Sequence, residues 1–297
     1  MDGTRQTRLD GLAIALIVGC CLIWGLNQVV VKVTLPLVPA LMQGALRSAF
    51  AALLVGLWAR HRGIALFSAD GTNAAGLVAG LLFALEFCCI YWGLQYTSAS
   101  RAILFLYLAP FVVALGMPFI SHSERLRPAQ MAGMTLAFGG LAYAFQDGLA
   151  TGASSQQWLG DLLSACGAVL WGLTTLWIRA TPLARAAPER TLFAQLAVSA
   201  PVMALASLVA GEPMPRLDVA LAWGSLAYQS VVIAFASYLT WFWLLRHYPA
   251  TRVSAFTFLT PVLGLAAGVV LLGEPLSGAM IAGLGGVAVG LWLVNRR

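Results

Sequence analysis

Long apolar runs alternate with short polar segments along almost the whole chain. Each run holds about 18–25 residues, enough for an α-helix to cross the roughly 30 Å hydrocarbon core of a bilayer. The pattern therefore predicts an all-α integral membrane protein with ten transmembrane helices, with no room for a separate soluble domain between them. The predicted spans are 11–33, 38–59, 74–96, 99–120, 128–146, 158–178, 190–210, 219–245, 251–272 and 276–294.

One segment of the chain occurs twice. ATRVSAFTFLTP at residues 250–261 repeats ASRAILFLYLAP at residues 99–110, with the same Ala, Arg and Pro at matching places. The two copies open the ninth and fourth predicted spans. The ninth span comes five places after the fourth, an odd offset, so the copies must cross the membrane in opposite directions.

Other features repeat at the same interval. The triplet Trp-Gly-Leu at residues 24–26 recurs at residues 171–173, and in each half a Glu follows the longer repeat, as Glu124 and Glu274. These echoes predict two inverted-topology repeats of five helices, residues 1–150 and 151–297. Two such halves can exchange conformations and expose a central site to each side in turn. A transporter needs that symmetry, whereas an enzyme or a scaffold does not.

Composition supports a membrane location. The chain is 60% hydrophobic and only 9% charged, where soluble domains have about 25% charged residues. With the N-terminus in the cytoplasm, most Lys and Arg residues lie on the cytoplasmic side, which follows the positive-inside rule. We therefore expect a multi-pass protein of the bacterial cytoplasmic membrane with both termini inside. The net charge of +6 then reflects loops facing anionic lipid and not a nucleic-acid partner.

The order and spacing of these motifs resemble the drug/metabolite transporter superfamily, specifically its EamA branch of ten-span proteins. The resemblance rests on Trp24-Gly25 and Trp171-Gly172 and on the two twelve-residue repeats with their following Glu residues. It implies two repeated EamA-like domains and a transport function. The aromatic-rich chain is also similar to the YddG-type exporters of this branch, which implies export of aromatic and neutral amino acids.

The placement of the spans puts only two ionisable residues, Arg47 and Glu86, deep inside a span. Such residues are costly in lipid and mark a cavity, an ion pair or a proton relay. Arg47 could bind a substrate carboxylate, with Glu86 as its counter-ion, as a partner for an α-ammonium or as a proton carrier. Alternatively, the two residues form a structural bridge between the second and third spans. The resemblance implies a basic residue in the second span of each half, but the second half has Gln195.

Polar and aromatic side chains within the spans complete the predicted substrate site. Each has an alternative role, as an interhelical hydrogen-bonding group or as a packing residue. The mid-span Gln229 is a further polar position of this kind. The substrate-binding candidates are Trp24, Asn27, Gln43, Arg47, Glu86, Tyr91, Tyr107, Trp171, Gln195, Tyr228 and Trp241.

Two pairs of charges at the span ends suggest alternating gates. The topology places Arg101 and Glu274 on the outer side and Arg252 and Glu124 on the inner side, each pair joining opposite halves. One pair would close while the other opens. Alternatively, each Glu stabilises the N-terminal end of the span that follows it and each Arg extends to the interface.

The chain shows no catalytic cluster, no nucleotide-binding motif and no metal-ligand pattern, so we expect a secondary transporter without a cofactor and not an enzyme. Its partners would be membrane lipid and a small amphipathic metabolite, with an aromatic or neutral amino acid as the favoured substrate. A multidrug or cationic-compound exporter, with Glu86 binding the cation, is the alternative, and an intramembrane enzyme is a remote one. Glycine-rich segments at 133–140 and 283–290 predict close helix packing away from the pathway, and they suit a monomer or a homodimer.

Overall fold

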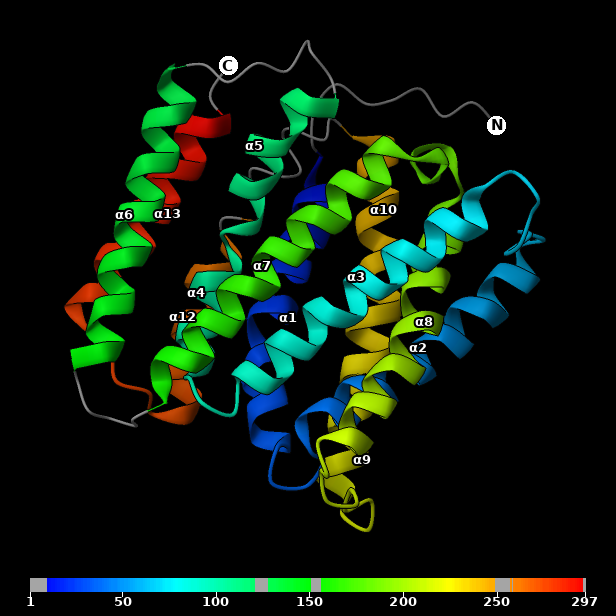
Figure 1. Ribbon diagram of the computed structural model, residues 1–297, viewed down its shortest axis with the longest axis horizontal. Helices are drawn as coiled ribbons and strands as arrows, with labels where there is room; N and C mark the ends of the chain where they lie inside the picture. The colour runs from blue at the N-terminus through cyan, green and yellow to red at the C-terminus, as the bar shows by residue number, and fades with distance from the viewer. Residues whose placement is uncertain (1–9, 121–127, 151–155, 249–256, 258, 296–297) are drawn as a thin grey trace.

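The computed structural model describes residues 10–120, 128–150, 156–248, 257 and 259–295. In this part of the chain all regular structure is helical (Figure 1). The helices of the first half are α1 (Gly11–Thr34), α2 (Ala40–His61), α3 (Thr72–Gly93), α4 (Ala99–Leu106), α5 (Ala109–Ile120) and α6 (Pro128–Ala150). Those of the second half are α7 (Gln157–Ala180), η1 (Pro182–Arg185), α8 (Pro188–Val209), α9 (Ala220–Ala227), η2 (Tyr228–Ser237), α10 (Tyr238–His247), α12 (Leu259–Leu272) and α13 (Gly278–Asn295).

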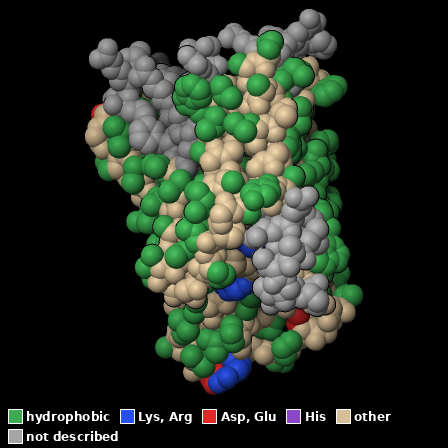
Figure 2. Space-filling view, turned by 90° about the vertical axis from the view of Figure 1, so that its left-hand side faces the viewer, with side chains coloured by type: hydrophobic (Ala, Val, Ile, Leu, Met, Phe, Trp, Pro, Cys, Tyr) green, Lys and Arg blue, Asp and Glu red, His purple; other side chains and the backbone are tan. Residues whose placement is uncertain are grey.

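These helices form the ten predicted spans. Among the described residues, seven segments are long and apolar enough to cross a membrane on their own, with α4 and α5 together as one of them and the run from α9 to α10 as another. The helices α6, α12 and α13 provide the remaining crossings. The surface in Figure 2 is mostly hydrophobic with few charged side chains, as expected for a face in contact with lipid tails.

The two halves run in opposite directions. The start of α1 and the end of α13 lie at one end of the bundle, here called the terminal end, and the opposite end is the far end (Figure 1). α1 runs from the terminal end to the far end, whereas α7, its counterpart, runs back toward the terminal end. The helix contacts follow the same symmetry, because α7 packs on α3 as α1 packs on η2 and α10. The predicted inverted repeat is confirmed.

The fourth span is broken, which the apolar pattern did not predict. α4 ends at Leu106 and α5 begins at Ala109, so Tyr107 and Leu108 interrupt the helix just before Pro110. Proline has no N–H to donate and disfavours helical geometry in the residues before it. The matching Pro261 lies in the first turn of α12. Interrupted helices of this kind leave backbone groups free at the centre of many transporters.

The eighth span contains ten residues of π-helix, η2, between α9 and α10. A π-helix has a wider turn than an α-helix and occurs frequently at functional sites. In η2 the polar side chains of Gln229, Ser230 and Ser237 are buried. The matching span of the first half, α3, is a regular α-helix, so the two halves differ at this point.

The close packing predicted for the two glycine-rich segments is found between α6 and α13, a pairing that the sequence did not predict. A Cβ atom on Gly290 would lie 2.4 Å from the carbonyl oxygen of Gly133, and one on Gly140 would lie 3.2 Å from Cα of Gly283. The absence of side chains lets the two backbones approach closely. The pair lies at one edge of the bundle, away from α2 and α3 (Figure 1).

Two Gly-Glu-Pro triplets bind the halves together at the far end. In both, the Gly has a positive φ, 66° at Gly211 and 65° at Gly273, and it ends a helix. The next residue, Glu212, accepts hydrogen bonds from the first backbone N–H groups of α2, at 2.9 and 3.0 Å. Glu274 does the same for α4, at 2.7 and 2.9 Å. Carboxylates thus satisfy two helix N-termini of the opposite half.

We expect Gly25→Ala to lower the melting temperature of the purified protein in detergent by several degrees. A Cβ atom on Gly25 would lie 2.8 Å from the backbone nitrogen of Gly264, where α1 crosses α12. Such overpacking costs roughly 1–3 kcal/mol. Gly19→Ala on the same helix is the control, because a Cβ atom there meets nothing within 4 Å. Equal melting temperatures for the two variants would contradict the crossing.

Candidate functional site

A chain of buried hydrogen bonds joins α2, α3 and η2. The Tyr91 hydroxyl donates to Oε1 of Gln229 at 2.7 Å, and Nε2 of Gln229 donates to Oε1 of Gln43 at 3.0 Å. All three side chains are at most 1% exposed. Gln43 in turn donates to backbone carbonyl groups of Val31 and Val38. Since buried polar groups are costly unless paired, this chain fixes the relative positions of the three helices.

Arg47 lies one turn after Gln43 on α2, beside this chain. Its guanidinium carbon lies 3.9 Å from the ring centroid of Phe87 and 5.9 Å from that of Phe83, as in a cation–π contact. The side chain is 1% exposed, yet none of its three nitrogens has a hydrogen-bond partner. The neighbouring Ser48 hydroxyl is also buried without a partner. The site therefore presents free donors in a closed environment.

Glu86 supplies the opposite charge. It is 4% exposed, and its Oε2 atom has no hydrogen-bond partner. Glu86, Tyr91 and Tyr238 all interact electrostatically with the Arg47 guanidinium. No hydrogen bond joins Arg47 to Glu86, so the structural bridge that the sequence allowed is not formed here. We call Gln43, Arg47, Ser48, Glu86, Tyr91, Gln229 and Ser230 the polar site.

An aromatic cluster contacts η2 through Tyr228 and Ser237. Nε1 of Trp24 donates to the Ser237 hydroxyl at 2.7 Å, and its ring meets that of Trp241 edge-on with centroids 5.3 Å apart. The Tyr228 hydroxyl donates to the carbonyl oxygen of Ile23 at 2.7 Å. Trp24, Tyr228 and Trp241, all predicted site residues, thus come together from α1, η2 and α10.

Two further predicted residues line the interior near this cluster. Asn27, one turn after Trp24 on α1, is 8% exposed, and its Oδ1 atom has no partner. Tyr107 lies at the break between α4 and α5 and donates to the carbonyl oxygen of Thr257 in the other half at 2.8 Å. The broken helix and the second half are therefore joined at the centre of the molecule.

The structure does not bring Trp171 and Gln195 to the others. Trp171 is 41% exposed, because the adjacent Gly172 makes the close contact with α5. Gln195 is buried on α8. α8 contacts α2 at Gly44 and at Gly56. From these two contacts, Gln195 lies about two helical turns from Arg47 along the direction of the helices.

The residues of the predicted gates have other partners or lie outside the described part of the chain. Nε of Arg101 donates to both carboxylate oxygens of Asp161 at 3.1 Å, and the Thr97 hydroxyl donates to Oδ1 at 2.6 Å. Glu274 instead accepts hydrogen bonds at the N-terminus of α4 in the opposite half, and not at the span that follows it, where the alternative interpretation placed it. Glu124 and Arg252 are not among the described residues.

The buried pair of Arg101 and Asp161 was not predicted. The two residues lie near the starts of α4 and α7, yet their side chains are only 2% and 0% exposed. Asp161 follows the first turn of a predicted span, where its acidic side chain could have been noticed. The buried hydroxyl groups of Ser48, Ser230 and Ser237 were also missed. Serine is common in transmembrane helices at positions that serve only helix packing, so its presence alone does not indicate a site.

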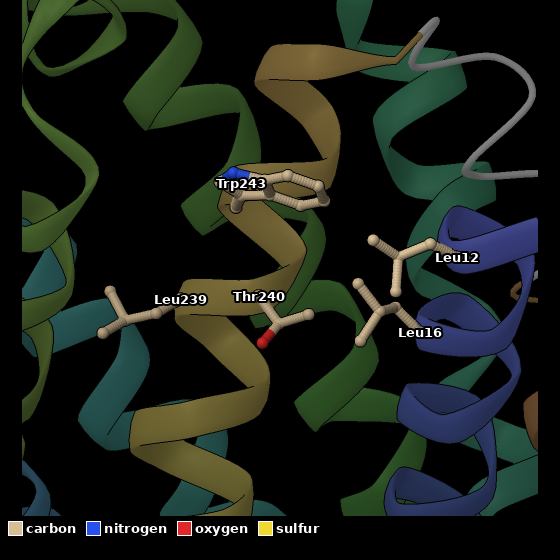
Figure 3. A pocket seen from close by; sticks show the side chains of 5 residues that line it. All are labelled: Leu12, Leu16, Leu239, Thr240 and Trp243. Carbon is tan, nitrogen blue, oxygen red and sulfur yellow. The ribbon is translucent and has the colours of Figure 1, made fainter. Parts of the chain in front are cut away.

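A cavity of about 380 Å³ lies between α1 and α10. In Figure 3, Leu12 and Leu16 of α1 point across it toward Thr240 and Trp243 of α10. Leu12 is 60% exposed and Trp243 is 39% exposed, so the cavity opens at the surface. It is near the terminal end of α1 and does not include the residues of the polar site, which is closed in this structure.

Comparison with known proteins agrees with the fold. The model of the EamA-like transporter family matches residues 11–146 and 158–296. A protein from Salmonella typhimurium, called a probable amino-acid metabolite efflux pump, is 29% identical over 97% of this chain and 95% of its own. A protein of the same description from Escherichia coli is 28% identical, with the same coverage. A solved crystal structure, 22% identical, has a TM-score of 0.66 and covers 96% of this chain and 98% of its own.

The family match covers both halves of the chain, and the crystal structure shares the fold. With ten spans in two inverted repeats and a buried polar site between them, this multi-pass membrane protein is a transporter and not an enzyme. The chain belongs to the EamA-like transporter family.

Proposed function

We propose that this protein exports small amino-acid metabolites by alternating access, with aromatic and neutral amino acids as the favoured class. The membrane would be the bacterial cytoplasmic membrane, with both termini in the cytoplasm. The proposal rests above all on the polar site, which offers a positive and a negative group, both buried and both with free hydrogen-bonding atoms. The two bacterial relatives named as probable amino-acid metabolite efflux pumps support it.

An amino-acid backbone fits the chemistry of the polar site. The three free nitrogens of Arg47 can hold a carboxylate, which a guanidinium binds in a bidentate manner. The free Oε2 atom of Glu86 can accept from an α-ammonium group. A substrate with both groups would satisfy donors and acceptors whose burial is otherwise costly. The hydroxyl groups of Ser48 and Ser230 are free to add further hydrogen bonds.

The aromatic cluster suits the side chain of such a substrate. Phe83 and Phe87 flank Arg47, and the cluster of Trp24, Tyr228 and Trp241 contacts η2, the helix that also supplies Gln229 to the polar site. Aromatic pairs gain about 0.5–1.5 kcal/mol beyond the burial of area. A cationic compound is less well served, because Arg47 would repel it from Glu86.

Transport by the purified protein in liposomes tests this proposal. We expect labelled phenylalanine to exchange across the bilayer faster than in protein-free vesicles, and unlabelled leucine or tryptophan to compete. A cationic dye and a sugar phosphate should compete poorly, because the site offers one buried cation and one buried anion. The measurement is counterflow of the label at equal pH on both sides. Strong competition by the dye with none by amino acids would favour a cationic-compound exporter.

A further inference from the structure

The charges of the polar site balance each other. Arg47 carries a permanent positive charge, because a guanidinium does not deprotonate in proteins. Glu86 is the carboxyl group that interacts with it, and the two side chains are 1% and 4% exposed. With both groups ionised, the empty site has no net charge.

The other titratable groups near Glu86 do not change the net charge of the polar site. The phenols of Tyr91 and Tyr238 interact with the same guanidinium, and the thiols of Cys89 and Cys166 lie on α3 and on the adjacent α7. Phenols and thiols are mostly uncharged near pH 7. None of these groups therefore adds a charge to the site at neutral pH.

Charged groups farther along the neighbouring helices are also accounted for. On α7, Asp161 is neutralised by Arg101 of α4, and Arg179 lies in the last turn. On α8, Glu189 and Arg190 lie in the first turn, at the terminal end. On α2, Arg60 and His61 lie in the last turn. The net charge of the polar site is therefore set by Arg47 and Glu86.

We propose that the charge of the substrate decides whether a proton is carried with it. A zwitterion, bringing one positive and one negative charge, crosses alone. A monoanion that has the carboxylate but lacks the ammonium crosses together with one proton, which binds Oε2 of Glu86 on one side and is released on the other. This inference rests on the proposed function and adds proton coupling to it.

The physical reason is the cost of a net charge in a closed, lipid-surrounded site. When a substrate carboxylate binds Arg47, two carboxylates share one cation, and the weaker partner takes up a proton. Glu86 is that partner, because its Oε2 atom is free and no other described group donates to it. An α-ammonium placed against Glu86 supplies the same positive charge, so no proton is needed.

The experiment compares phenylalanine with 3-phenyllactate, in which a hydroxyl group replaces the ammonium. The full-length protein is reconstituted into liposomes that contain a pH-sensitive dye, with potassium and valinomycin holding the membrane potential at zero. Initial rates of labelled uptake and of proton uptake are measured together, and the rates of protein-free vesicles are subtracted. We expect about one proton per phenyllactate and none per phenylalanine.

The variant Glu86→Gln provides the second measurement. We expect it to carry phenyllactate without protons, at a rate that now responds to an imposed membrane potential, and to carry phenylalanine at least tenfold more slowly. Proton-free uptake of phenyllactate by the native protein, or its complete exclusion while phenylalanine moves, would overturn the inference and leave the proposed function standing. Absence of protein-dependent uptake of any amino acid would overturn the proposed function itself. If Glu86→Gln does not fold, the numbers of protons taken up per phenyllactate and per phenylalanine by the native protein decide.

Discussion

Asp161→Ala is expected to prevent stable folding of the protein. The change leaves the Arg101 guanidinium, 2% exposed, without the carboxylate that accepts from its Nε atom. It also removes the acceptor for the Thr97 hydroxyl. Removing one partner of a buried ion pair costs about 3–5 kcal/mol, because the remaining charge stays buried after losing the carboxylate that compensated it. The monodisperse fraction in detergent and its melting temperature measure the effect.

Two further variants show whether the buried charge is the cause. Asp218→Ala is the matched control, since this acid is 72% exposed and lies 3.9 Å from Arg216, and exposed pairs contribute only about 0–1 kcal/mol. The double variant Asp161→Ala, Arg101→Met should recover much of the lost stability, because no uncompensated charge remains. A double variant as unstable as Asp161→Ala alone would show that the loss comes from packing.

Arg47→Met is expected to lower amino-acid transport at least 100-fold without lowering the melting temperature. The nitrogens of Arg47 have no hydrogen-bond partners. Burying this charge therefore lowers the stability of the folded protein, and the charge is useful only when substrate binds. Methionine of similar length removes this buried charge without breaking a hydrogen bond, and Glu86, which then lacks its cation, can take up a proton and become neutral. Counterflow of labelled phenylalanine and thermal unfolding in detergent measure the two effects.

Arg47→Lys and Arg62→Met sharpen this test. Lysine keeps the charge but loses the planar group that stacks on Phe87, so transport should fall less than in Arg47→Met. Arg62 makes a similar contact at the end of α2, 5.6 Å from the Trp58 ring, and its loss should change transport by less than twofold. A large fall in melting temperature for Arg47→Met, with transport retained, would assign Arg47 a structural role instead.

The linear pattern of residues predicted most of the architecture. Apolar runs of bilayer length can only become helices in lipid, since every backbone group must be satisfied within its own segment. The spacing of the repeated segments then set their opposite directions. The close helix contact at Gly133 and Gly140 was also predictable, although not its partner, because small residues in a span serve mainly for close packing.

Side-chain partners could not be predicted in the same way. Glu86 looked like the partner of Arg47 and Glu274 like the partner of Arg101, because opposite charges were paired by their expected level in the membrane. Level alone does not give the rotation of a helix about its axis. In the structure Arg101 faces Asp161 of α7, and Glu274 turns back to bind backbone N–H groups of α4.

The sequence by itself determined the membrane location, the ten crossings and the inverted halves, because the hydrophobic length of the runs and an odd offset of five spans between the repeats leave no other arrangement. Only the tertiary structure decided which polar groups meet. The widened turn of η2 brings Gln229 to Tyr91 and Gln43, and Trp171 is turned outward although its counterpart Trp24 is hydrogen-bonded inside. Those outcomes depend on helix rotation and on local departures from α-helical geometry, which are set by packing between segments far apart in the chain.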